Sequence, residues 1–215
     1  MITDKENGAF AISLRAAGCD GDTLREFGRV LKACGRSSID TFLDTRREFL
    51  EVGKACIARA LLPFEAELQL SPGRPGAWYH YLFDKLYTSS ADEFAQNKLT
   101  IITFNFDRAF ERALFLSLMA NYRLQKSRYV ELARSIEVLH VHGQLGEPSW
   151  LNGGPAARPY GLVDGPHVEE NHIRISAAQI RIVHEEVDSD VLAQALVQLQ
   201  AAEVICSLGF GYQSE

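Results

Sequence analysis

The sequence predicts an α/β fold with a mostly parallel sheet, helices on both faces of that sheet and a helical N-terminal or inserted lobe. The strongest strand signal is residues 99–104, which are rich in β-branched side chains and almost free of charge, as expected of a strand covered on both faces. Residues 136–141 and 204–208 predict a second and a third strand. Strands that alternate with helices favour parallel pairing.

The first part of the chain, residues 1–75, is mainly helical by its pattern. Apolar residues at helical spacing predict a helix over 23–34, and Ser38 or Asp40 is placed to cap a long helix that Pro63 kinks or ends. Residues 71–76 are rich in proline and glycine and predict a loop at the lobe boundary. The sheet-bearing part is then 76–215, and we treat 1–215 as a single domain.

Further helices are predicted over 78–86, directly after Asp107, over 177–183 and over 191–202. The glycine- and proline-rich stretch 143–165 is long for a connection inside a compact domain, which favours a lid or binding loop.

Composition excludes several classes of function. The formal net charge is -6 and no Lys/Arg run exceeds the pair Arg46 and Arg47, which argues against a nucleic-acid binder. The four cysteines form no C-x-x-C pair, so we do not expect a zinc ribbon. The sequence instead predicts a protein of a reducing compartment. No apolar leader or membrane-length run occurs, so the sequence predicts a cytoplasmic protein without a membrane segment.

The first candidate site is residues 103–107, Thr-Phe-Asn-Phe-Asp, where a strand is predicted to end and a helix to begin. Ligands of open α/β sheets bind at such strand ends, and Asn105 with Asp107 offers donors and acceptors to a polar ligand. The alternative is local: Asp107 caps the helix and Asn105 satisfies turn amides.

The second candidate site is His140-Val141-His142-Gly143, at the end of the next strand. Residues two apart on a strand share a face, so both histidines could point the same way, and a histidine there can act as general base near neutral pH. Two metal ligands at this spacing are the alternative, but no third ligand stands nearby. Gly209 and Gly211 follow the predicted third strand, either as turn residues or as a backbone approach to a ribose or phosphate.

Together these segments resemble the signature of the sirtuin-like family, in its zinc-free bacterial branch. That family carries Thr-Gln-Asn-Ile-Asp followed by Glu-Arg-Ala, where this chain has residues 103–107 followed by Glu111-Arg112-Ala113. His142-Gly143 and Leu208-Gly209 match the family's two later strand ends, in the same order. Three features of the family are not matched in this chain. They are the Gly-Ala-Gly-x-Ser phosphate turn, the zinc module, and the glutamine that the family carries where this chain has Phe104.

The resemblance implies a Rossmann-like sheet that binds NAD and holds no metal. Asn105 and His142 would be catalytic, and Thr103, Asp107, Gly143, Gly209 and Gly211 would contact the nucleotide. The implied function is an NAD hydrolase that releases nicotinamide, of the kind found in bacterial antiphage defence. The alternatives are an NAD-dependent protein deacylase and a non-catalytic nucleotide-sensing or interaction module.

The missing phosphate turn also predicts that the sequence is a piece of a longer protein, incomplete at both ends. A homo-oligomer and further domains outside the chain stay open as expectations.

Overall fold

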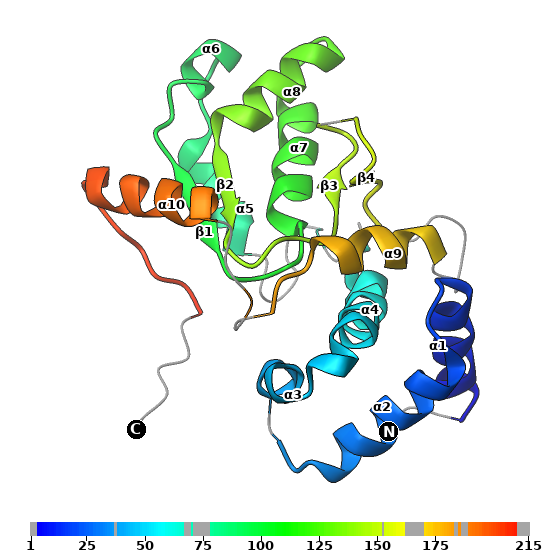
Figure 1. The fold of residues 1–215 in the computed structure, drawn as a ribbon. Helices are drawn as coiled ribbons and strands as arrows, with labels where there is room; N and C mark the ends of the chain where they lie inside the picture. Colours follow the sequence, from blue (N-terminus) through cyan, green and yellow to red (C-terminus); the bar gives the residue numbers. More distant parts are fainter. Residues whose placement is uncertain are drawn as a thin grey trace.

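The structure is a computed structural model, which describes residues 4–36, 38–66, 70, 78–151, 153–161, 170–182, 185 and 189–209. It is a mixed α/β fold, mostly helical, with a parallel pair of strands. Figure 1 shows the N-terminal helices gathered at one end of the molecule and the strands at the other.

The N-terminal helices are α1 (Asp4–Ala16), α2 (Gly21–Ala33), α3 (Ile39–Thr45) and α4 (Leu50–Leu61). Helix α2 confirms the prediction for 23–34. The Asp20 side chain caps this helix by accepting hydrogen bonds from the N–H groups of Asp22 and Thr23, at 3.1 and 2.8 Å.

The single long helix predicted beyond residue 38 is wrong, because a 3₁₀ turn at Arg47–Phe49 separates α3 from α4. In one straight helix, residues 42 and 49 would stand about 10 Å apart along the axis. The break lets the rings of Phe42 and Phe49 stack at 6.1 Å, with Phe27 against both. Aromatic packing therefore overrides the helical pattern at this point.

The sheet-bearing part contains α5 (Trp78–Leu86), α6 (Ala91–Phe94), β1 (Thr100–Thr103), α7 (Ala109–Asn121), α8 (Lys126–Ser135) and β2 (Glu137–His140). Strands β1 and β2 pair in parallel, from Thr100 opposite Glu137 to Thr103 opposite His140. Both strands, and the parallel pairing, were predicted from the sequence. Their apolar side chains Ile101 and Val138 pack on a core formed largely by α7 and α8.

After β2 the chain forms a short parallel pair, β3 (Glu147–Pro148) with β4 (Ala157–Arg158), and then α9 (Glu170–Gln179) and α10 (Ser189–Ala201). Helix α10 confirms the prediction for 191–202, and Gln194 on it donates a hydrogen bond to Glu137 of β2. The helix predicted over 177–183 is wrong, since α9 ends at Gln179. Figure 1 shows α10 and α7 on opposite sides of the two strands.

The predicted third strand is also wrong. Residues 204–208 are described but form no strand, and Val204 is 85% exposed. A strand exists only through backbone pairing with a neighbour, and β1 and β2 pair only with each other in the described residues. The sheet therefore has two strands where the sequence predicted at least three.

The helical and sheet-bearing parts are joined by α9, which packs against α4. Lys54 of α4 also forms an ion pair with Glu185 at 2.6 Å, with 7% and 16% of the two side chains exposed. The lobe boundary predicted at residues 71–76 lies outside the described residues. Among the described helices, none combines the length and the apolar character that a membrane crossing needs.

Candidate functional site

The loops that follow β1 and β2 lie side by side. The N–H of Val141 donates to the carbonyl of Thr103 at 3.0 Å, and the N–H of Leu145 donates to the carbonyl of Phe106 at 2.8 Å. The parallel pairing of the strands therefore continues into the loops, and the two candidate segments of the sequence meet at one edge of the sheet.

Asn105 and Asp107 both have exposed side chains in the first loop. The N–H of Asn105 donates to the Thr103 hydroxyl at 3.1 Å, and Asp107 Oδ1 accepts the N–H of Ala109 at 3.1 Å. This Asp107 contact is local, but the N-cap position of α7 is Arg108, and no side-chain hydrogen bond caps the helix there. The second carboxylate oxygen of Asp107 and the Asn105 amide are polar groups at the surface that a ligand can contact.

His142 lies in the turn after β2, against the ring of Phe104 at a centroid distance of 5.7 Å. Its Nδ1 is buried and has no hydrogen-bond partner among the described residues. A buried polar atom without a partner is costly, so one that persists calls for an explanation, such as a ligand group that pairs with it.

Gly143 has a φ of +77°, and a Cβ at this position would overlap the carbonyl oxygen of Gln179, at the end of α9. The adjacent carbonyl of His142 accepts the N–H of Arg181 at 2.8 Å. The sequence suggested that a glycine here lets a ligand approach the backbone. In the structure it is the end of α9 that makes the close approach.

Gly209 is exposed, with a φ of +68° and open space around it. No hydrogen bond in the described part of the chain joins it to the Asn105 or His142 loops. Gly211 lies outside the described residues. The structure therefore brings together the two loops that carry Thr103, Asn105, Asp107, His142 and Gly143, and no described hydrogen bond links Gly209 to them.

His140 does not share the surroundings of His142, although the sequence placed both on one face. Its Nε2 lies 2.8 Å from Glu111 Oε1 on α7, and its Nδ1 lies 2.9 Å from the carbonyl oxygen of Asn105. Strand β2 ends at His140, so the alternation of faces stops there. With both nitrogens engaged, His140 is not available as a metal ligand, and the described residues hold no cluster of three or more potential ligands.

Burial opposes the charged form of His140, but the hydrogen bond and charge of Glu111, with smaller contributions from the Asn105 carbonyl and Asp107, outweigh it and raise the pKa of His140. We expect the stability that the imidazolium contributes to be fully present below its unfolded pKa of about 6.5 and to be lost as pH rises through the raised folded pKa.

The measurement is the free energy of unfolding of wild type and His140→Gln across pH, by urea denaturation. The difference between the two should be largest at the acid end and shrink toward alkaline pH. A difference that grows with pH would contradict this assignment.

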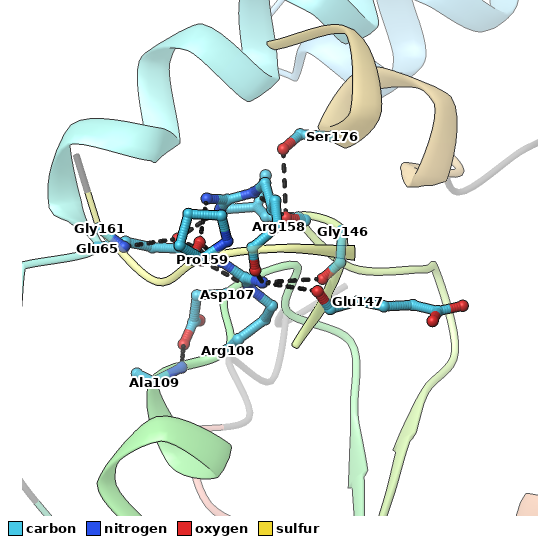
Figure 2. Close-up of polar contacts among 11 residues, drawn as sticks. Glu65, Asp107, Arg108, Ala109, Gly146, Glu147, Arg158, Pro159, Gly161 and Ser176 are labelled. Atoms are coloured by element: carbon cyan, nitrogen blue, oxygen red, sulfur yellow. Dashed lines mark hydrogen bonds and ion pairs between the residues drawn. The ribbon is translucent and has the colours of Figure 1, made fainter. Parts of the chain in front are cut away.

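Arg108, directly after Asp107, is the centre of a buried network that the sequence analysis missed (Figure 2). Its Nε and Nη2 donate to the two carboxylate oxygens of Glu65 at 2.9 and 2.8 Å, and the side chains are 0% and 2% exposed. Its guanidinium also donates hydrogen bonds to four main-chain carbonyl oxygens in the segment after β2, those of Gly146, Glu147, Arg158 and Pro159. One signal existed in the sequence: an arginine at a helix start opposes the helix dipole, so its place there needs another reason.

Arg158 completes the network from β4. It donates to Glu65 and to the carbonyl of Leu145, so one carboxylate serves two buried guanidinium groups. Burial and the nearby charge of Arg108 lower the pKa of Arg158 to about 10, although Glu65 opposes the shift. The network ties residues 65, 108, 145–147 and 158–161 together, so the described part of the predicted lid is anchored at both ends.

Two surface hollows of about 220 and 360 Å³ border the segment that follows β2, which contributes Gln144 and Pro148 to the first and Pro155 and Ala156 to the second. The first is lined by residues of α7, α8 and β2, including Glu111 and Glu137, and the second lies along α9. Neither contains Asn105, Asp107 or His142 in its lining. We place the candidate site at the strand ends because the two hydrogen-bonded loops there carry Asn105, Asp107 and His142.

Comparisons with models of protein families, with curated proteins and with solved structures found no match. The function is therefore argued from the residues and their geometry.

Proposed function

We propose that this chain is a zinc-free, sirtuin-like domain of the antiphage-defence kind that binds NAD and hydrolyses it, releasing nicotinamide. The observation that carries the proposal is the hydrogen-bonded pair of loops at the ends of β1 and β2, which holds an amide, a carboxylate and an imidazole at one edge of a parallel sheet. Their order along the chain agrees with the sirtuin-like pattern.

The reaction breaks the glycosidic bond between C1′ of the ribose and the nicotinamide nitrogen. Nicotinamide leaves with the bonding electron pair, and positive, oxocarbenium-like charge develops on the ribose. Water then bonds to C1′ and loses a proton, which yields ADP-ribose. Fixed dipoles and a base near the reacting carbon serve this chemistry better than a strong nucleophile does.

Each side chain has a role in the proposal. Asn105 orients the ribose and the attacking water, Asp107 accepts a hydrogen bond from the nicotinamide carboxamide, and His142 takes the proton from water. The exposed Asn105 amide suits the nicotinamide and ribose half of NAD, and His142 lies in the neighbouring loop with a buried Nδ1 that has no partner among the described residues. The diphosphate half has no glycine-rich turn to receive it in residues 1–25, where glycine occurs only singly, at Gly8, Gly18 and Gly21.

The test is to incubate purified protein with NAD and follow nicotinamide release by chromatography. We expect turnover by wild type and a loss of about 10²-fold or more in Asn105→Ala and His142→Ala, the usual scale for a positioned acid–base group. Asn121→Ala is the matched control, because this exposed asparagine donates to Ser117 within α7, away from the strand ends, and should keep wild-type turnover. Absence of turnover in wild type, or alanine variants as active as wild type, would overturn the proposal.

A second candidate is a non-catalytic nucleotide-sensing module, favoured by the bond from the Ala109 N–H that already occupies Asp107 Oδ1. Calorimetry with NAD and ADP-ribose separates the two: binding without nicotinamide release supports the sensor. NAD consumption that requires an acylated peptide would support a deacylase.

A further inference from the structure

Both ring nitrogens of His140 face acceptor oxygens when Glu111 is ionised. Nδ1 faces the main-chain carbonyl of Asn105 and Nε2 faces the carboxylate of Glu111, at 2.9 and 2.8 Å. A carbonyl oxygen only accepts hydrogen bonds, and so does an ionised carboxylate. A neutral imidazole has one N–H and can satisfy only one of them. Both contacts are therefore hydrogen bonds when the ring is an imidazolium and Glu111 is ionised.

The electrostatic surroundings favour that charged state. The His140 and Glu111 side chains are 7% and 8% exposed, so water screens the pair poorly. The charged groups that act on the ring are Glu111 of α7 and Asp107 of the loop after β1, and both are acidic. The neighbouring His142 turns to the ring of Phe104 instead.

We propose that doubly protonated His140 is a positioning residue, which clamps the backbone of Asn105 and thereby sets the direction of the Asn105 side chain. Its meaning for catalysis rests on the proposed function, whereas the clamp itself does not. The bond from His140 reaches across from β2 to the loop after β1, beside the two main-chain bonds that join the loops.

Loss of a proton releases the loop and leaves the helix attached. A carboxylate is a charged acceptor and binds an N–H more strongly than a carbonyl does, so the remaining proton stays on Nε2, facing Glu111. Nδ1 then turns a lone pair toward the Asn105 carbonyl oxygen, and the two acceptors repel. Protonation of His140 thus controls the loop that carries Asn105 and Asp107.

The experiment is a pH titration of isotope-labelled full chain by NMR, with the imidazole nitrogens and the backbone amides of residues 105 and 106 observed together. We expect His140, assigned by its disappearance in His140→Gln, to carry both ring protons at about pH 7 and to titrate above the ordinary histidine pKa of about 6.5. The amides should shift with the same midpoint, and the neutral form should carry its proton on Nε2. A neutral His140 at pH 7, or amides that do not follow it, would overturn the clamp.

Glu111→Gln is the decisive variant, since it keeps the shape of the side chain and removes its charge. The common midpoint of His140 and the amides should fall by about 1–3 pH units, the usual effect of one close opposite charge. His80→Gln is the matched control, because His80 also bonds a carbonyl oxygen, that of Leu70 at 2.7 Å, and should leave the amide titration unchanged. An unchanged midpoint in Glu111→Gln would reject the clamp.

Nicotinamide release supplies a separate measurement. If wild type cleaves NAD, kcat should fall as pH rises through the midpoint found by NMR, and in Glu111→Gln this fall should move to lower pH with it. A fall in kcat that stays at the wild-type pH in this variant would contradict the positioning role. If wild type does not cleave NAD, the proposed function fails, and the NMR result still decides the clamp.

Discussion

Glu65→Gln is expected to lower the free energy of unfolding by about 3–5 kcal/mol, the usual cost of breaking a buried ion pair by removing one partner. Among the described residues, the carboxylate of Glu65 is the anion bonded to both Arg108 and Arg158. Glutamine keeps the shape but leaves two guanidinium groups, each 0% exposed, without a counter-charge. Burial and the charge of Arg108 already lower the pKa of Arg158, and the repulsion between the two guanidinium groups would then lack the opposing charge of Glu65.

Urea denaturation of wild type and variant measures the effect. Asp22→Asn is the control, because it breaks the exposed pair with Arg25, where the side chains are 84% and 68% exposed, and should leave stability nearly unchanged. Arg158→Met should destabilise less than Arg108→Met, since it leaves the two-pronged bond between Arg108 and Glu65 in place. Equal, small effects of Glu65→Gln and Asp22→Asn would show that the network contributes little to folding.

Gly143→Ala is expected to destabilise the fold by about 2–5 kcal/mol, the sum of two costs. The left-handed backbone at φ +77° disfavours any residue with a Cβ, and the added methyl group would overlap the Gln179 carbonyl oxygen. That neighbour is main chain at the end of α9, which packs on α4, so it cannot move aside as a flexible side chain does.

Gly35→Ala separates the two costs. Gly35 has a similar φ of +63° but open space around it, so only the backbone cost of about 1–2 kcal/mol is expected. Thermal or urea unfolding of both variants gives the comparison. If Gly143→Ala destabilises the protein no more than Gly35→Ala does, the end of α9 moves away from the added methyl group at no cost in stability.

Local patterns predicted much of the candidate site. The β-branched run at residues 99–104 identified β1, and the helical spacing beyond Asp107 identified α7, so the loop carrying Asn105 could be placed between them. The same reasoning failed at residues 204–208, which have the composition of a strand but no pairing partner in the described residues. Composition shows that a segment is able to form a strand, but the strand forms only when a neighbouring strand pairs with its backbone.

The sequence by itself determined the two parallel strands, helices α5, α7 and α10 around them, and the order in which Asn105, Asp107 and His142 follow the strand ends. Only the tertiary structure decided which groups these residues face. Glu111 stands 29 residues from His140, and Glu65 stands 43 residues from Arg108, so no local spacing could reveal either pair. The reason is physical: secondary structure depends on near neighbours along the chain, but the charge and hydrogen bonding of a buried side chain depend on whichever distant segment packs against it.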